Sequence, residues 1–246
     1  MDAKSKKIII AAVIALVAVA AVAALVIFVG MPAIRYGRAG SLENKGDLPG
    51  AYEAYDRMED YRGAQAAKEK LQDGVIASRS AVSMEFGGYE WLILEERDGK
   101  VLLLMAEVLD ARVYHPTLVS VDWEGCTLRQ WLNGAFYETL PKEDRARIVQ
   151  TTVVNSDNAE YGTKGGKDTK DNVFLLSLAE ANLYFRTDAA RVGRSGGSVK
   201  HWWLRSPGME AMLAATVTSE GKLGFAGSGV SYNNRGVRPA LWITKG

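Results

Sequence analysis

The chain has 246 residues, 30 Lys and Arg against 29 Asp and Glu for a net charge of +1, and one cysteine. This length allows one sizeable domain with additional segments. The near-neutral charge argues against a nucleic-acid-binding protein, which needs a basic face, and one cysteine cannot form an internal disulfide.

The first predicted element is an apolar helix over residues 8–31. A bilayer core needs about 20 such residues, and the run is longer than the apolar core of a cleaved signal peptide, about 7–15 residues. It is preceded by Lys4, Lys6 and Lys7, which favours a cytoplasmic location for the N-terminal residues 1–7. We therefore expect a single-pass signal anchor in the cell membrane with the C-terminal domain extracytoplasmic. A cleaved signal peptide and a buried core helix are the alternatives.

Residues 35–75 are predicted to form short helices. One pattern, an aspartate followed shortly by Gly-Ala, begins at Asp47 and again at Asp60, and each aspartate can cap the turn that follows it. The spacing after Gly46 is similar to half a tetratricopeptide repeat, but a stable array needs about three repeats of about 34 residues. A helical stalk is therefore favoured over a peptide-binding groove.

The segment 80–246 is predicted to be one α+β domain, because short strands alternate with few helices and long loops. Arg97-Asp98-Gly99-Lys100 indicates a hairpin between two of its strands. The predicted strands are 89–94, 101–106, 212–218, 223–226 and 237–243; the predicted helices are 128–137, 141–148 and 178–185; the predicted loops are 155–170 and 186–200.

Two C-terminal motifs are the most specific feature of this domain: Trp202-Trp203-Leu204-Arg205-Ser206-Pro207-Gly208 and Gly236-Val237-Arg238-Pro239-Ala240-Leu241-Trp242-Ile243. Phe86–Trp91, Trp123–Asn133 and Phe174–Ser177 complete the pattern upstream. Over residues 82–243 the chain resembles a bacterial family of uncharacterised domains. The resemblance implies a fold related to C-type lectins and to the formylglycine-generating enzyme, and it implies no settled activity.

Several motif residues are expected to be structural: Trp131, Trp202, Trp203, Arg205, Gly236, Arg238 and Trp242. Trp91, Trp131, Trp203 and Trp242 should be mostly buried. Because arginines are seldom buried unless paired, Arg129, Arg205 and Arg238 should form structural ion pairs with Glu124, Glu180 or Asp171. A clamp for a ligand carboxylate is the alternative.

Pro239 constrains the last strand. Proline cannot donate to a ladder, so this strand should lie at a sheet edge or begin after Pro239.

No catalytic residue, cofactor or metal is predicted. The formylglycine-generating enzyme uses a cysteine pair, and iron-dependent relatives use three histidines, whereas this chain has only Cys126, His115 and His201. Cys126 is interpreted as a small buried residue. A triad built on Ser206 and His201 is disfavoured, because no Gly-x-Ser-x-Gly elbow is present.

Oxygen ligands are frequent between residues 155 and 171, where Asn155, Asp157, Asn158, Asp168 and Asp171 could bind calcium. Their spacing does not match an EF-hand. A solvated loop with Asx turns is favoured, and calcium binding stays open at this point.

The candidate ligand-binding residues lie between the two C-terminal motifs: Tyr232, Asn233, Asn234, Arg235, Met209, Glu210 and Phe225. Tyr, Asn and Ser are typical of recognition loops, although Asn233–Gly236 is also a good turn. We expect a membrane-anchored, non-catalytic module that binds a protein or glycan ligand. An assembly role for the helical stalk is the alternative, and an enzyme of unknown type is a weaker one.

Overall fold

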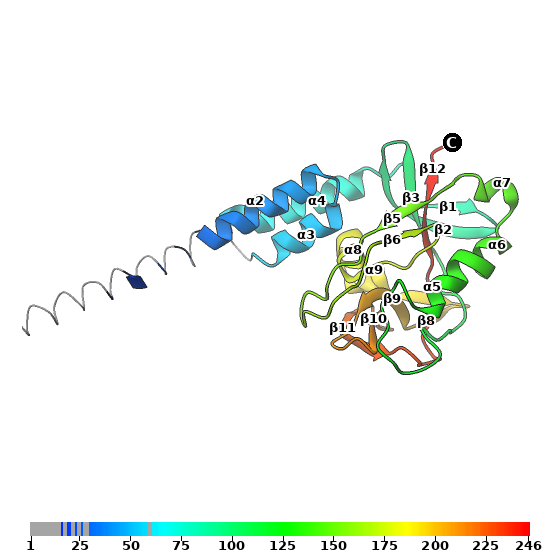
Figure 1. The fold of residues 1–246 in the computed structure, drawn as a ribbon. Coiled ribbons are helices and arrows are strands. Elements are labelled where there is room, and N and C mark those ends of the chain that lie inside the picture. Colours follow the sequence, from blue (N-terminus) through cyan, green and yellow to red (C-terminus); the bar gives the residue numbers. More distant parts are fainter. Residues whose placement is uncertain (1–15, 17–18, 21–22, 24–25, 27–29, 59–60) are drawn as a thin grey trace, which may run out of the picture. The chain divides into compact units, whose positions relative to one another are not determined.

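The computed structural model describes residues 16, 19–20, 23, 26, 30–58 and 61–246 (Figure 1). The chain divides into two compact units, with the boundary in the sequence between Leu71 and Gln72. Most of the anchor predicted over residues 8–31 lies outside the described residues. Among the residues that are described, no helix is both long and apolar enough to span a bilayer.

The N-terminal unit is helical, as predicted for residues 35–75. Its elements are α2 (Met31–Asn44), α3 (Leu48–Asp56), the 3₁₀ helix η2 (Tyr61–Gly63) and α4 (Ala64–Ala77), which continues past the unit boundary. Asp47 caps α3 as expected, because its Oδ1 accepts a hydrogen bond from Gly50 N at 3.0 Å. Asp60, the second predicted cap, lies outside the described residues.

The C-terminal unit is a mixed α+β structure with several antiparallel sheets. Its largest sheet has the order β1-β2-β3-β12-β4. The strands are β1 (Ser83–Phe86), β2 (Tyr89–Arg97), β3 (Lys100–Met105), β4 (Ile148–Val149) and β12 (Ala240–Thr244). The hairpin predicted between β2 and β3 is confirmed: Asp98 and Gly99 adopt φ values of 51° and 68°, the left-handed pair that a tight hairpin turn requires.

Strand β12 begins directly after Pro239 and lies between β3 and β4. The prediction that it begins after the proline is therefore correct, and the sheet-edge alternative is wrong. Pro239 still contributes its carbonyl, which accepts a hydrogen bond from Met105 N at 2.9 Å.

The second sheet has the order β11-β10-β9 and lies at the other end of this unit in Figure 1. Its strands are β9 (Trp202–Pro207), β10 (Leu213–Val217) and β11 (Leu223–Gly229). All of β9 is buried. Because successive side chains of a strand point to opposite faces, Trp202 and Trp203 fill the packing on both sides of the sheet, and each is 0% exposed.

Two small hairpins and several short helices complete the unit. The hairpins are β5 (Thr151–Val153) with β6 (Thr169–Asp171), and β7 (Gly193–Ser195) with β8 (Ser198–Lys200). The helices are α5 (Thr127–Trp131), the π-helix η3 (Leu132–Phe136), α6 (Tyr137–Thr139), α7 (Lys142–Arg145), α8 (Leu178–Tyr184) and α9 (Asp188–Arg191).

The helix predicted over residues 141–148 is shorter in the structure. It ends at Arg145, because Ile148 pairs with Ile243 as part of β4. The tertiary pairing with β12 thus overrides the local helical tendency.

The predicted core tryptophans are buried to different degrees. Trp91 and Trp203 are 0% exposed, whereas Trp131 and Trp242 are only partly buried. Side chains alternate along β12, so Leu241 and its second neighbour Ile243 are at 0% exposure while Trp242 points to the less covered face.

Candidate functional site

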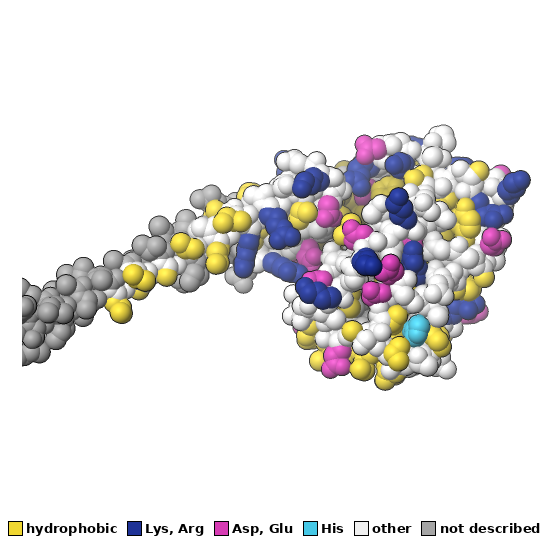
Figure 2. All heavy atoms as spheres, viewed as in Figure 1, with side chains coloured by type: hydrophobic (Ala, Val, Ile, Leu, Met, Phe, Trp, Pro, Cys, Tyr) yellow, Lys and Arg dark blue, Asp and Glu magenta, His cyan; other side chains and the backbone are white. Residues whose placement is uncertain are grey.

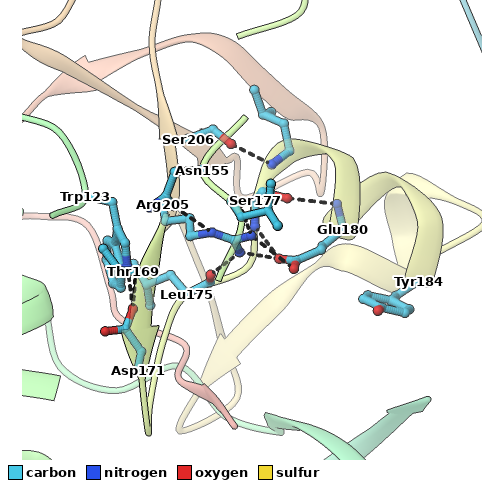
Figure 3. Close-up of polar contacts among 12 residues, drawn as sticks. Trp123, Asn155, Thr169, Asp171, Leu175, Ser177, Glu180, Tyr184, Arg205 and Ser206 are labelled. Carbon is cyan, nitrogen blue, oxygen red and sulfur yellow. Dashed lines mark hydrogen bonds and ion pairs between the residues drawn. The ribbon is translucent and has the colours of Figure 1, made fainter. Parts of the chain in front are cut away.

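The arginine of the first C-terminal motif, Arg205, is held in a buried network (Figure 3). Its Nη2 donates to Glu180 Oε1 at 3.1 Å, its Nη1 pairs with the other oxygen of the same carboxylate, and its Nε donates to Asn155 Oδ1 at 3.2 Å. The carbonyls of Leu175 and Val154 accept two further bonds, at 2.7 and 2.9 Å. A guanidinium has five N–H donors, so Arg205 is fully occupied within the protein.

The same motif also closes the N-terminus of α8. Ser177 Oγ accepts from Glu180 N at 3.1 Å while a Glu180 oxygen accepts from Ser177 N at 2.7 Å, which forms a capping box. Ser206 Oγ accepts from Leu178 N at 3.0 Å (Figure 3). The Ser206 hydroxyl is therefore bound to the N-terminus of α8. The Nε2 atom of His201 lies 3.2 Å from Ser219 Oγ. The structure does not bring Ser206 and His201 together.

A second predicted ion pair joins Arg129 to Asp171, with 2.7 Å between Nε and Oδ1. The other carboxylate oxygen accepts from Trp123 Nε1 at 2.9 Å and from Thr169 Oγ1 at 2.7 Å (Figure 3). This pair joins the central motif, Trp123–Asn133, to strand β6. It is one of the structural ion pairs that the sequence predicts.

Arg238 differs from the other two arginines. It is 2% exposed, yet its guanidinium donates to the carbonyls of Met105 and Ala106 at 2.9 and 3.1 Å and stacks 5.2 Å from the Trp202 ring. Within the described part of the chain no carboxylate forms an ion pair with it, so the predicted ion pair is wrong here. Burial lowers the pKa of Arg238 to about 10.

The oxygen-rich loop over residues 155–171 uses its side chains to hold itself in place. Asp168 Oδ1 accepts from Asn155 N at 3.0 Å, and Asp157 binds both Lys164 Nζ and Gly165 N. No group of three or more His, Cys, Asp or Glu in the described residues could hold a metal ion.

Asn158 anchors this loop to the second sheet. Its Oδ1 forms the expected Asx turn with Glu160 N at 3.0 Å, and its Nδ2 donates to the carbonyls of Pro207, Gly208 and Phe225. Since Asn158 is 1% exposed, the prediction of a merely solvated loop needs correction.

Cys126 is 0% exposed, which confirms the prediction that it is a small buried residue. Its Sγ caps α5 by accepting from Arg129 N at 3.4 Å, and burial raises the pKa of the thiol to about 12. A thiol of this kind is almost entirely protonated at neutral pH and is a poor nucleophile.

The candidate ligand-binding residues form two groups in the structure. In the first, Tyr232 is 52% exposed and Asn233 and Asn234 are exposed beside it. Arg235 donates from Nε to Ser228 Oγ at 3.2 Å and from Nη1 to Asn234 Oδ1 at 2.7 Å, and its Cζ lies 5.9 Å from the centre of the Tyr232 ring. We call these four residues, 232–235, the Tyr232–Arg235 surface.

The second group lies next to the 155–171 loop. Met209 is 46% exposed, and its backbone N–H donates to Ala226 O at 3.0 Å, directly beside Phe225. Thr163 Oγ1 donates to Met209 O at 2.9 Å. Glu210 follows, exposed, in the turn before β10.

The sequence alone did not single out Leu118. This residue is 51% exposed. Its side chain and the Tyr232 ring both occupy the space next to Gly229 that a larger residue's Cβ would need. Met212, 36% exposed, accepts a backbone hydrogen bond from Val230 close by. Figure 2 shows exposed hydrophobic side chains over the part of the unit that holds β10 and β11 in Figure 1. Leu118 lies in a loop without periodicity, so no pattern distinguished it from an ordinary surface leucine.

The model of a domain of unknown function, DUF6273, matches residues 98–245. The chain belongs to this family. The matched segment contains both C-terminal motifs and the Tyr232–Arg235 surface, and it begins in the turn between β2 and β3. Neither the comparison with curated proteins nor that with solved structures gives a match.

A cleft of about 420 Å³ lies partly within the DUF6273 domain and partly on β2 before it. Its lining residues are Gly88, Tyr89, Glu90, Met105, Glu107, Val108, Leu109, Asp110 and Ser195. Three of these are carboxylates and none is Lys or Arg, so the cleft has an acidic lining. No sequence pattern indicated it, because its walls come from β2, the segment after β3 and β7.

Proposed function

We propose that this chain is a membrane-anchored protein that displays residues 80–246 outside the cytoplasmic membrane as a non-catalytic, lectin-like recognition module. The observation that carries the proposal is the Tyr232–Arg235 surface. Tyr232 leaves half of its side chain in solvent while Arg235 is held beside it by Ser228 and Asn234. Tyrosine offers large contact area at low entropy cost, and the amides adapt their hydrogen bonds to a ligand.

The neighbouring apolar side chains strengthen this interpretation. Leu118 and Met212 extend the exposed surface around Tyr232. Single exposed apolar residues are ordinary, but a contiguous patch with polar groups around it is typical of an interaction site. The chain directly after this surface is bound to the start of β9, the strand that carries Arg205: Gly236 N donates to His201 O at 2.8 Å, and Gly236 O accepts from Trp203 N at 3.1 Å.

Two side chains support a non-catalytic role. Cys126 is buried with a raised pKa, and the Ser206 hydroxyl is bound to the N-terminus of α8. Each is the residue type that a nucleophilic mechanism would use, and each has a structural partner instead.

Assembly through the helical unit is the second candidate function. It is favoured by an apolar side chain on α2 that follows the proposed anchor, Ile34, which is 74% exposed. A helical partner that covered it would gain apolar burial.

Co-sedimentation with the cell envelope tests the recognition proposal. The full-length chain in detergent is mixed with envelope fragments, and the wild type is compared with the double variant Tyr232→Ala/Arg235→Ala. The control is Tyr161→Ala/Arg57→Ala, which removes a tyrosine that is 44% exposed and an arginine whose side chain is 52% exposed. We expect the first double variant alone to lose binding. Equal binding by all three folded proteins would refute the proposed site.

A further inference from the structure

Arg235 has N–H donors that form no hydrogen bond within the described residues. Within the described chain its side chain donates two hydrogen bonds, to Ser228 Oγ and Asn234 Oδ1, out of the five that a guanidinium can donate. Among the described residues no carboxylate forms an ion pair with it, in contrast to Arg205 and Arg129. Its two hydrogen bonds and the Tyr232 ring hold the guanidinium in place, so little side-chain entropy would be lost when a ligand binds.

The surroundings of Arg235 carry further positive charge. Its carbonyl accepts a hydrogen bond from Arg112 N at 3.0 Å, so the backbone of Arg112, whose side chain is exposed, lies beside that of the half-buried Arg235. The Arg112 guanidinium stacks 4.0 Å from the Trp131 ring and also forms no ion pair in the described chain. Two arginines without counter-ions favour an anionic ligand over a neutral one.

The other members of the surface match a sugar. The exposed Tyr232 ring offers an amphipathic face for the apolar side of a pyranose, while Asn233 and Asn234 expose side-chain amides that can both donate to and accept from hydroxyl groups. The guanidinium fork matches a planar carboxylate with two parallel hydrogen bonds.

We propose that the Tyr232–Arg235 surface binds a carboxylate-bearing saccharide, with the carboxylate on Arg235, the sugar ring on Tyr232 and hydroxyl groups on Asn233 and Asn234. This inference rests on the proposed recognition function and names its ligand class. It also gives the two arginines different roles: Arg235 binds the carboxylate directly, and Arg112 adds to the positive field.

Paired saccharides test the inference. Glucuronic, galacturonic and N-acetylmuramic acids, their neutral counterparts and glucose 6-phosphate are immobilised at equal density, and binding of the full-length chain in detergent is measured. We expect at least one acidic sugar to bind at least tenfold more tightly than its neutral counterpart and than the sugar phosphate. Arg235→Lys, which keeps the charge but loses the fork, should remove the preference over the sugar phosphate and reduce that over the neutral sugar, and Tyr161→Ala should leave both unchanged.

Three results would overturn the inference: no acidic sugar binds, the acidic and neutral sugars bind equally, or the phosphate is preferred. A melting curve for each variant shows that the domain is folded. If the sugars fail while envelope binding still depends on Tyr232 and Arg235, the ligand class is wrong and the recognition function stands. If envelope binding is independent of both residues, the proposed site itself is wrong.

Discussion

Arg205 and Glu180 form the buried ion pair on which the base of the second sheet depends. In Arg205→Ala, the Glu180 side chain, which is 14% exposed, loses its cation and the carbonyls of Leu175 and Val154 lose a donor. Removing one partner of a buried pair costs about 3–5 kcal/mol, and we expect a loss of that size in the free energy of urea unfolding.

The matched control for this prediction is Lys164→Ala. Its ion pair with Asp157 is open to solvent, with side chains 84% and 47% exposed, so about 0–1 kcal/mol should be lost. Equal losses in the two variants would contradict the structural role assigned to Arg205.

Cys126 gives a prediction with a defined pH dependence. Its folded pKa of about 12 lies above the ordinary thiol value of about 8.5. The unfolded state therefore releases its proton first, and the thiol's contribution to stability, complete below about pH 8.5, declines as the pH rises towards the folded pKa. Between about pH 8.5 and 9.5, wild-type stability should fall more steeply than that of Cys126→Ser. Parallel curves, or rapid alkylation of the folded protein, would show that the thiol is accessible.

At the scale of elements, Trp203 and Trp131 should differ in their effect on stability. Trp203 is 0% exposed within β9, packs 5.7 Å from Tyr114 and donates from Nε1 to Arg112 O, so Trp203→Ala should cost about 3–5 kcal/mol. Trp131 ends α5 with part of its ring exposed under Arg112. Trp131→Ala should cost clearly less in the same unfolding experiment. The reverse order would mean that α5, and not β9, anchors the core.

The elements that could be predicted are those specified locally. Asp98-Gly99 fixes the β2–β3 hairpin, Ser177 and Glu180 mark the start of α8, and Pro239 marks the start of β12. Strand β4 could not be predicted, because its two residues become a strand only through pairing with β12. The π-helix after Trp131 has no local signal of comparable strength.

The same distinction between local sequence signals and long-range packing applies to the candidate site. Composition indicated Tyr232 and its neighbours as a recognition loop. It could not indicate that Met209 and Phe225 are bound to the 155–171 loop, or that Leu118 lies next to Tyr232, since these placements depend on long-range packing. The ion pair proposed for Arg238 failed for a related reason: the carbonyls of Met105 and Ala106, at and just after the end of β3, accept from its Nε and Nη2, while its buried Nη1 has no hydrogen-bond partner among the described residues.

At the scale of the whole molecule, the proposed location predicts the result of protease treatment of intact cells. From the three lysines before the apolar segment, we propose that residues 35–246 lie outside the cytoplasmic membrane. Protease added to intact cells should therefore remove the C-terminal unit, whereas a cytoplasmic control protein should survive until lysis. A C-terminal unit that is digested only after lysis would reverse the proposed orientation.

Hydrogen–deuterium exchange of the full-length chain, with and without solubilised cell-envelope fragments, tests the central claim most directly, because it locates a bound ligand without assuming its identity. The account predicts slower exchange in residues 228–236 and in the adjoining segment around Leu118, with little change elsewhere. Slower exchange confined to the 155–171 loop, or to the acidic cleft around residues 105–110, would contradict the claim that the Tyr232–Arg235 surface is the recognition site.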